Sequence, residues 1–218
     1  MLSAVVVGPK GLHKATLIFA HGLGDSGYGW SRTFEQLNLS GIKYVFPNAP
    51  SIPVTLNNNM IMTAWYDIYQ LSEEAKEDEE GVKRSAREIH KLIDHEVETG
   101  LASNNIFIGG FSQGAAVSLY AGITYPGNLA GLIALSSYFP LRRQFTSFSV
   151  SNKGVKIFQA HGKYDDIVSY EWGKKSYEYL KSLNLPVTFK TYENLGHHSS
   201  AEEMADIKCF IQNLINNF

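Results

Sequence analysis

The sequence predicts an α/β fold in which helices cover both faces of a mainly parallel central sheet. Short apolar runs that suit buried strands alternate along the chain with stretches of helical period, which is typical of parallel-sheet proteins. The 218 residues are 44% hydrophobic and 18% charged, so there is enough apolar material to bury a sheet on both faces. This length is common for one α/β domain, and we expect a single domain over residues 1–218.

Strands are expected where short apolar runs stop at glycine, proline or polar residues. Six such runs span residues 16–20, 43–46, 105–109, 131–135, 155–159 and 187–191, and a short edge strand is expected at 5–7. Helices are expected over residues 80–98, 112–123, 170–183 and 199–214. The first and last of these helices carry apolar stripes at helical spacing: Val82, Ala86, Ile89, Ile93 and Val97, then Met204, Ile207, Phe210, Ile211 and Leu214.

Two stretches interrupt this alternation. Residues 48–72 are rich in proline, asparagine and aromatic side chains, and a long excursion of this kind is typical of a lid or binding loop. Residues 138–152 lie between two strands and could also border a site. The acidic run 73–80 precedes a helix, where anions are favourable, so we expect a solvated face there rather than a metal site.

Charge and cysteine content narrow the class of protein. The net charge of −2 gives no basic field for nucleic acid and argues against tight docking on anionic lipid, although it leaves room for transient membrane contact. The lone cysteine, Cys209, cannot form an internal disulfide and is expected to be a small core residue. The first residues lack a basic region before their apolar run, and no run approaches the roughly 20 residues that span a bilayer. We therefore expect a cytoplasmic protein that is a monomer or a weak homodimer.

The strongest motif is Gly110-Phe111-Ser112-Gln113-Gly114, which fits G-x-S-x-G. In this pattern a serine lies on a sharp turn between a strand and a helix, and the flanking glycines let the neighbouring backbone approach without a Cβ clash. A predicted strand enters the motif and a predicted helix leaves it. This context favours a serine nucleophile at Ser112 in an α/β-hydrolase fold over a glycine-rich structural turn.

The partners of such a serine should follow it in the order acid, then histidine, each after a strand. The strand at 155–159 leads to Asp165 and Asp166, and the strand at 187–191 leads to His197 and His198. Chemistry alone leaves the choice within each pair open. A metal site built from these residues and His161 is disfavoured, because the spacings of metal-ligand motifs are absent.

An oxyanion hole is also required. One donor should be the backbone N–H that follows the nucleophile, on Gln113, and the other should come from the glycine-rich loop after an early strand. That loop is His21-Gly22-Leu23-Gly24-Asp25-Ser26-Gly27, and the N–H of Leu23 is the expected donor. Two-step acyl transfer by these groups needs no cofactor and no metal.

Taken together, the motifs resemble those of the acyl-protein thioesterase family, also called the lysophospholipase/carboxylesterase family. The matching segments are residues 21–27, 53–57, 65–68, 109–114, 134–137, 161–162 and 192–193. The resemblance selects Asp165 as the acid and His197 as the base, and it supports Leu23 and Gln113 as oxyanion donors. It also implies a flat loop over an apolar acyl channel, with lining positions at Leu56, Ile68, Leu71 and Ile167 and with Trp65 and Tyr138 nearby.

Four positions depart from what the resemblance implies. Leu2 stands where some relatives carry a lipid-accepting cysteine, Asn58 where a channel residue can be apolar, Asp166 where proline is frequent, and His198 where a small polar residue is common. The implied substrates are S-acylated proteins or lysophospholipids, with a short-acyl carboxylesterase as the alternative. A non-catalytic binding module is the alternative of another class, and such modules typically lose a member of the triad.

Overall fold

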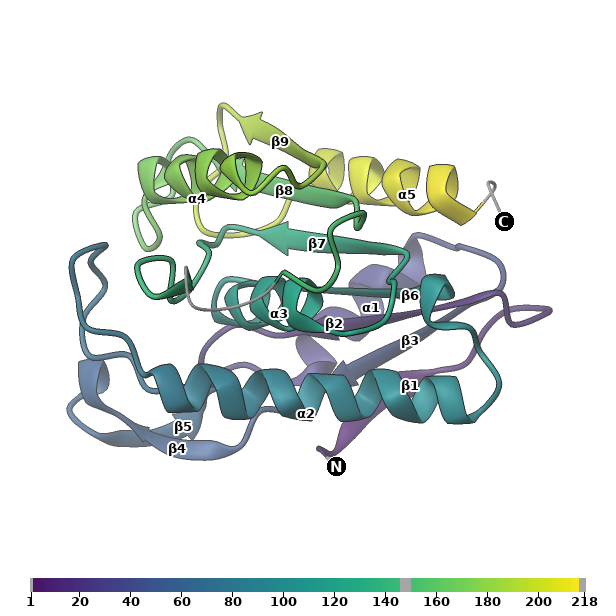
Figure 1. Ribbon diagram of the computed structural model, residues 1–218, viewed down its shortest axis with the longest axis horizontal. Coiled ribbons are helices and arrows are strands. Elements are labelled where there is room, and N and C mark those ends of the chain that lie inside the picture. The colour runs from purple at the N-terminus through teal and green to yellow at the C-terminus, as the bar shows by residue number, and fades with distance from the viewer. Residues whose placement is uncertain (1, 146–149, 216–218) are drawn as a thin grey trace.

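A seven-stranded sheet forms the centre of the computed structural model, which describes residues 2–145 and 150–215 (Figure 1). Its strands are β1 (Ala4–Val7), β2 (Ala15–Ala20), β3 (Ile42–Pro47), β6 (Ile106–Phe111), β7 (Gly131–Leu135), β8 (Ile157–Gly162) and β9 (Val187–Tyr192). They lie in the order β1-β3-β2-β6-β7-β8-β9, and every pair is parallel except β1 with β3. All seven predicted strands are present, with ends that shift by at most three residues.

The order of the strands reverses direction next to β2. β3 and β1 lie on one side of β2, whereas β6 and the later strands lie on its other side. Loops that leave the carboxyl ends of β2 and β6 therefore diverge, which opens a crevice between them. This is where an open α/β sheet places its site.

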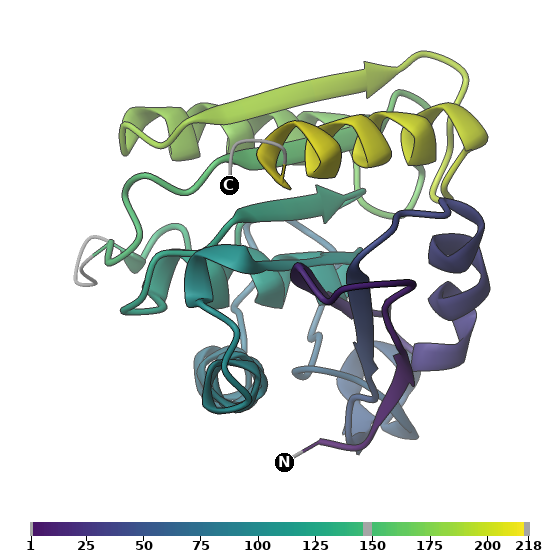
Figure 2. The ribbon, with the colours of Figure 1, turned by 90° about the vertical axis from the view of Figure 1, so that its right-hand side faces the viewer.

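Helices cover both faces of the sheet, which confirms the predicted fold class (Figure 2). Helices α1 (Gly27–Gln36) and α5 (Ala201–Ile215) pack on one face, and α2 (Glu79–Glu98), α3 (Gln113–Thr124) and α4 (Tyr170–Ser182) lie on the other. Helix α3, whose residues are mostly small and apolar, is buried along almost its whole length. The four predicted helices thus correspond to α2, α3, α4 and α5.

Helix α1 was not predicted from the sequence. Gly27 and Gly29 weaken its helical pattern, and its apolar stripe is short. The helix is stabilised instead by packing, because the rings of Trp30 and Phe34 lie 4.9 and 4.6 Å from the ring of Phe19 on β2. The spacing of Trp30 and Phe34 is the one sequence signal that could have revealed it.

The predicted excursion over residues 48–72 is only partly a loop. Its first half is a two-stranded hairpin of β4 (Ser51–Val54) and β5 (Met60–Thr63), which turns through Asn58 and Asn59 at φ values of 54° and 59°. Asparagine tolerates this left-handed region better than most residues, so the polar asparagines mark a turn. The following residues, 64–66, are buried in the core.

The second predicted excursion, residues 138–152, begins with residues that belong to the core, and its Tyr138 borders a cavity. Tyr138, Phe139, Leu141 and Phe145 are buried. Residues 146–149 lie outside the part of the chain that the structure describes.

Two predictions about burial are wrong, and a third holds only in part. Cys209 is exposed, because it lies on the opposite side of α5 from the buried Ile207 and Ile211. Val97 is 39% exposed at the last turn of α2, where the helix extends past the core. The acidic run is not a simple solvated face, since Glu77 accepts a hydrogen bond of 2.9 Å from the backbone N–H of Leu141.

Glu73, in the same acidic run, is paired with Arg142 and with Lys175.

In the described residues no helix is both long and apolar enough to cross a membrane.

Candidate active site

Ser112 lies at the sharp turn between β6 and α3. Its φ of 53° and ψ of −121° are unusual for a residue with a side chain, and strain of this kind is typical of functional sites. A Cβ on Gly110 would lie 2.4 Å from the carbonyl carbon of Gly114, and a Cβ on Gly114 would lie 2.3 Å from the carbonyl oxygen of Ala20. The two glycines of the motif are therefore required by the close contact of α3 with β2 and β6.

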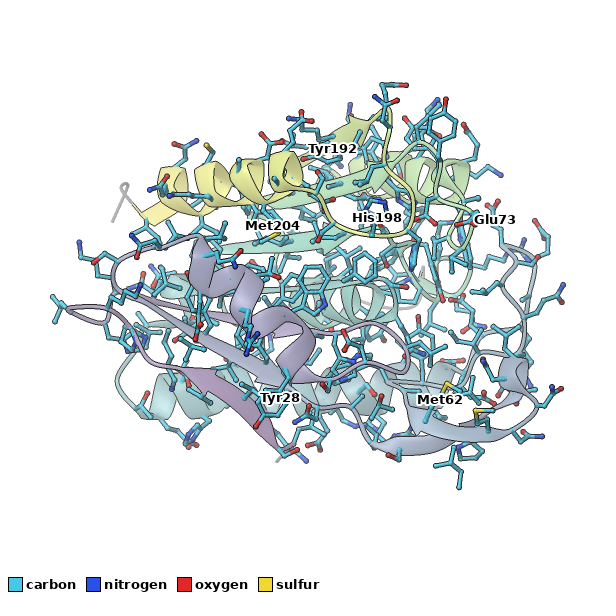
Figure 3. All side chains as sticks on the ribbon, turned by 180° about the vertical axis from the view of Figure 1, so that it is seen from behind. Tyr28, Met62, Glu73, Tyr192, His198 and Met204 are labelled. Carbon is cyan, nitrogen blue, oxygen red and sulfur yellow. The ribbon has the colours of Figure 1, made fainter. Side chains whose placement is uncertain are left out.

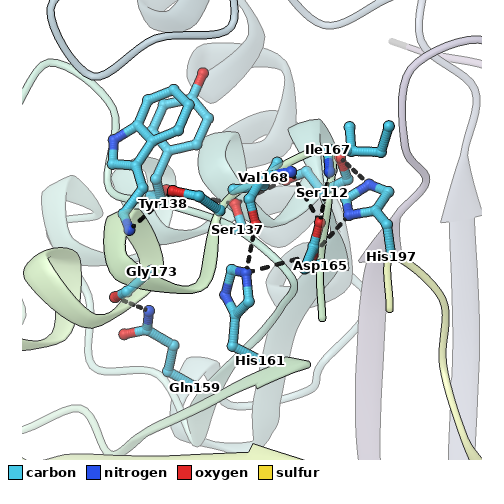
Figure 4. Close-up of polar contacts among 12 residues, drawn as sticks. Ser112, Ser137, Tyr138, Gln159, His161, Asp165, Ile167, Val168, Gly173 and His197 are labelled. Carbon is cyan, nitrogen blue, oxygen red and sulfur yellow. Dashed lines mark hydrogen bonds and ion pairs between the residues drawn. The ribbon is translucent and has the colours of Figure 1, made fainter. Parts of the chain in front are cut away.

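The Ser112 hydroxyl is within hydrogen-bond reach of an imidazole that lies next to a carboxylate (Figure 4). The Nε2 atom of His197 lies 3.0 Å from Ser112 Oγ, and its Nδ1 lies 2.8 Å from Asp165 Oδ2. Asp165 comes from the loop after β8 and His197 from the loop after β9. The carboxyl ends of three parallel strands, β6, β8 and β9, thus bring together side chains that are far apart in sequence.

The structure also separates the ambiguous pairs. Asp165 is buried, whereas Asp166 is exposed. His198 is exposed and its Nδ1 lies 3.1 Å from the carbonyl oxygen of Ser199, not near Ser112. Figure 3 shows His198 on the side of the molecule opposite to the view of Figure 1.

Four donors surround the Asp165 carboxylate. Its Oδ1 accepts hydrogen bonds from the backbone N–H groups of Ile167 (3.0 Å) and Val168 (2.8 Å), while Oδ2 lies near His197 and 3.3 Å from Nε2 of His161. Burial would raise the pKa of Asp165, but the contacts with the two histidines and with Val168 outweigh it and hold the pKa well below its usual range. The carboxylate is therefore ionised at neutral pH.

An ionised Asp165 fixes the tautomer of His197. Because a carboxylate only accepts, the ring donates from Nδ1, and Nε2 is left to accept the hydrogen of the Ser112 hydroxyl. The three side chains have the hydrogen-bonding order of a Ser-His-Asp triad.

The loop after β2 reaches the serine from the other side. A Cβ on Gly22 would lie 3.5 Å from the Cβ of Ser112, which shows how closely this loop approaches. Within the described residues, neither Leu23 nor Gln113 donates its backbone N–H to another backbone group. Both expected oxyanion donors are thus open to a ligand.

Buried polar contacts hold this loop in place. His21 is fully buried between the carbonyl of Gly22, 2.7 Å from its Nδ1, and the N–H of Ala49, which donates to its Nε2 over 3.1 Å. Burial lowers the pKa of His21, so the neutral ring bridges the two segments. The indole of Trp65 donates to the carbonyl of His21 over 2.8 Å.

The side chain of Gln113 also anchors the segment that contains Trp65. Its Oε1 accepts from the N–H of Trp65 over 2.9 Å, and its Nε2 donates to the carbonyl of Tyr66 over 2.7 Å. Gln113 therefore has two separate roles. Its backbone N–H is an available donor, and its buried side chain fixes the segment that contains Trp65 and Tyr66.

A cavity of about 260 Å³ opens beside Ser112 and His197. Its other lining residues are Gly22, Leu23, Asp25, Tyr66, Ile68, Leu71, Phe111, Gln113, Tyr138, Ile167 and Val168. Four of the expected channel residues line it, namely Ile68, Leu71, Tyr138 and Ile167. Five lining residues were missed: Tyr66, Val168, Gly22 and Asp25 of the glycine-rich loop, and Phe111 of the serine motif.

Two expected channel residues do not line this cavity. Trp65 is fully buried, and its indole N–H donates to the carbonyl of His21. Leu56 is 38% exposed in the turn of the β4–β5 hairpin, where its backbone N–H is bound to the carbonyl of Ile68. Trp65 supports the site from below and Leu56 lies outside it.

A second hollow of about 250 Å³ lies on another side of His197. It is lined by Asp25, Gly29, Trp30, Thr33, Phe111, His197, His198 and Ser199. Asp25, Phe111 and His197 line both spaces, so both border the imidazole. Within the described residues, no group of three or more His, Cys, Asp or Glu side chains has the arrangement of a metal site.

Comparisons with known proteins point to one family. The family described as phospholipase/carboxylesterase matches residues 1–215. An acyl-protein thioesterase 1 of Schizosaccharomyces pombe is 45% identical over 219 residues, which cover 99% of this chain and 98% of that protein. One from Neurospora crassa is 42% identical over 211 residues, which cover 91% and 86%.

A solved structure agrees with the sequence comparisons. The crystal structure of Zea mays acyl-protein thioesterase 2 has a TM-score of 0.90 at 35% identity, with 99% of this chain and 100% of that chain covered. The resemblance that the sequence motifs indicated is confirmed, and the alternative of a non-catalytic binding module is set aside. The chain therefore belongs to the phospholipase/carboxylesterase family and is a serine hydrolase with the α/β-hydrolase fold.

Proposed function

We propose that this hydrolase cleaves long-chain acyl thioesters, removing palmitoyl groups from cysteines of S-acylated proteins, or the esters of lysophospholipids, and that Ser112, His197 and Asp165 carry the reaction. The observation that supports it most is the position of the His197 ring, between Ser112 Oγ at 3.0 Å and Asp165 Oδ2 at 2.8 Å, beside an apolar-lined cavity. The names of the similar proteins, acyl-protein thioesterases, favour the thioester substrate.

The first half of the reaction would make an acyl-enzyme. His197 Nε2 accepts the proton of Ser112 as Oγ attacks the carbonyl carbon, and Asp165 stabilises the imidazolium that forms. The developing oxyanion would accept hydrogen bonds from the backbone N–H groups of Leu23 and Gln113. In comparable sites the loss of one such donor raises the barrier by roughly 3–4 kcal/mol.

The pKa of the leaving group determines whether His197 must protonate it. A cysteine thiol has a pKa of about 8.5 and leaves readily as thiolate, whereas the alcohol of an ester needs the proton that His197 holds. The hollow lined by Asp25 and His198 borders His197 as the acyl cavity does, so we assign the leaving group to this hollow. Water then repeats the attack and releases the acid.

The acyl chain would lie in the 260 Å³ cavity against Ile68, Leu71 and Ile167. Each methylene that it buries contributes about 0.8 kcal/mol. Leu71 and Ile167 are 37% and 49% exposed without substrate, so a bound chain would cover apolar surface that water now contacts. This covering favours long acyl groups over acetate.

One observation favours the short-acyl alternative. The hydroxyls of Tyr66 and Tyr138 lie 2.9 Å apart, and both residues line the cavity, so part of its wall is polar. A long chain that reached this pair would gain little from contact with it.

A chain-length series separates the two candidates. Hydrolysis of p-nitrophenyl esters with acyl groups of two to sixteen carbons would be measured beside a palmitoyl-cysteine peptide and a lysophospholipid. We expect kcat/KM to rise with chain length and the palmitoyl thioester to be cleaved; a maximum at two to four carbons would favour the carboxylesterase. Ser112→Ala serves as the inactive control, and its full turnover would refute the assigned nucleophile.

The cytoplasmic location, the transient membrane contact and the monomeric or weakly dimeric state stay predictions. Cell fractionation, vesicle sedimentation and size-exclusion chromatography of the purified protein test them in turn.

A further inference from the structure

His161 is a buried imidazole that the reaction described above does not use. It lies at the end of β8, four residues before Asp165, and its side chain is 0% exposed. Its Nε2 atom is 2.8 Å from the carbonyl oxygen of Val168 and 3.3 Å from Asp165 Oδ2 (Figure 4). Both neighbours are acceptors, so Nε2 carries the hydrogen and the ring is a donor toward them.

The ring therefore contacts Asp165 by two routes. The direct route is the contact of Nε2 with Oδ2, the same oxygen that faces His197. The indirect route passes through Val168, whose carbonyl accepts from His161 and whose own N–H donates to Asp165 Oδ1 over 2.8 Å. Loss of the ring would release the turn and the carboxylate together.

A second observation argues against a purely structural role. The other ring nitrogen of His161, Nδ1, is buried without a hydrogen-bond partner in the described residues. A Cβ on Gly173 would lie only 2.3 Å from this nitrogen, so α4 packs directly on the ring. An unsatisfied buried nitrogen is unfavourable, and an apolar side chain of similar size would avoid it. The donor at Nε2 is the property that only a polar side chain supplies.

We propose that His161 is a positioning residue for hydrolysis, whose Nε2–H group holds the Asp165 carboxylate in the orientation that aligns His197 with Ser112. The inference rests on the proposed roles of these three residues. The contacts then run from His161 on β8 to Asp165 and His197, and they end at the Ser112 hydroxyl.

A matched pair of variants tests the donor separately from the volume. In His161→Gln the amide nitrogen is as many bonds from Cβ as Nε2 is in histidine, so an N–H can reach the same acceptors. His161→Met has a similar length and no donor. Both are compared with the native chain on p-nitrophenyl butyrate, a substrate that does not depend on the long-chain proposal.

We expect His161→Met to lose roughly tenfold to a hundredfold in kcat with KM within about twofold, because misplacement by about an ångström at a distance from the chemistry can cost this much. His161→Gln should recover most of that loss. The acid limb of the kcat/KM profile of His161→Met should move to higher pH, since a carboxylate with one donor fewer attracts the imidazolium more strongly.

A control on the same strand detects a general effect of damaging the core. Gln159 is buried, and its Nε2 donates to the carbonyl of Gly173 over 2.8 Å; among the described residues it has no hydrogen bond to Asp165. Gln159→Met should lower stability without moving the pH profile, as followed by urea unfolding and by the same kinetics.

Two results would overturn the proposal: native kcat and pH profile in His161→Met, or equal losses in the Met and Gln variants with an unshifted acid limb. Activity that survives Ser112→Ala would instead refute the proposed function itself. The two failures are therefore distinguishable.

Discussion

Replacing Asp165 by asparagine tests the electrostatic arrangement of the site most directly. In the native chain both carboxylate oxygens accept: Oδ1 from the N–H groups of Ile167 and Val168, and Oδ2 from His197, with His161 close by. An asparagine side chain must place its NH₂ at one of these two positions. In one orientation it opposes two ring N–H groups, and in the other it opposes two backbone N–H groups.

Either orientation removes the native tautomer or distorts the loop. With NH₂ toward His197, the ring must accept at Nδ1, so its hydrogen moves to Nε2. The Nε2 atom can then no longer accept the proton of Ser112. Well-studied triads lose roughly 10⁴-fold in kcat by this change, which corresponds to about 5 kcal/mol of barrier at about 1.36 kcal/mol per tenfold. We expect a loss of about 10³- to 10⁴-fold in kcat/KM for Asp165→Asn.

The assay is p-nitrophenyl butyrate hydrolysis together with the rate of fluorophosphonate labelling at Ser112, which reports the reactivity of the hydroxyl. Asp166→Asn is the matched control, since Asp166 is exposed, and it should keep activity within about twofold. If Asp165→Asn stayed within tenfold of the native chain, or if Asp166→Asn were the damaged variant, the assignment of the acid would be wrong.

Three further predictions concern stability and exposure. Gly114→Ala should lower the free energy of unfolding by about 1–3 kcal/mol and impair activity, because its Cβ would lie 2.3 Å from the carbonyl oxygen of Ala20; Gly8→Ala, with no atom within 4 Å, should be silent in the same urea titrations. Glu203 is fully buried, its carboxyl oxygens have no hydrogen-bond partner in the part of the chain that the structure describes, and burial raises its pKa from 4.5 to about 8. The folded state therefore holds this proton more tightly than the unfolded chain, so native stability should fall as pH rises from about 4.5 to about 8. This fall in the free energy of unfolding is on the order of a few kcal/mol, and Glu203→Gln should remove it. The prediction is wrong if the free energy of unfolding of the variant, measured in urea, falls with pH as steeply as that of the native chain. Cys209 should react with a thiol reagent in the native state, and Cys209→Ser should change stability by no more than about 0.5 kcal/mol; protection of the thiol until unfolding would show that it is buried after all.

The sequence predicted the elements whose signal is local. Apolar runs placed all seven strands of the main sheet, and stretches of helical period placed α2, α3, α4 and α5. The serine motif was recognisable because a strand, a strained turn and a helix must follow one another directly. The elements that it missed, α1 and the β4–β5 hairpin, have weak local patterns and depend on the surfaces against which they pack.

The sequence by itself determined the fold class, the family resemblance and the order in which serine, acid and histidine follow the strands. The tertiary structure decided which member of each adjacent pair faces the serine, since Asp165 is buried beside His197 whereas Asp166 and His198 are exposed. It also decided that Trp65 supports the site, that Leu56 lies outside the cavity and that His161 reaches the carboxylate. Adjacent residues of the same type have almost the same local sequence environment, and only the packing of distant segments fixes the direction in which each side chain points.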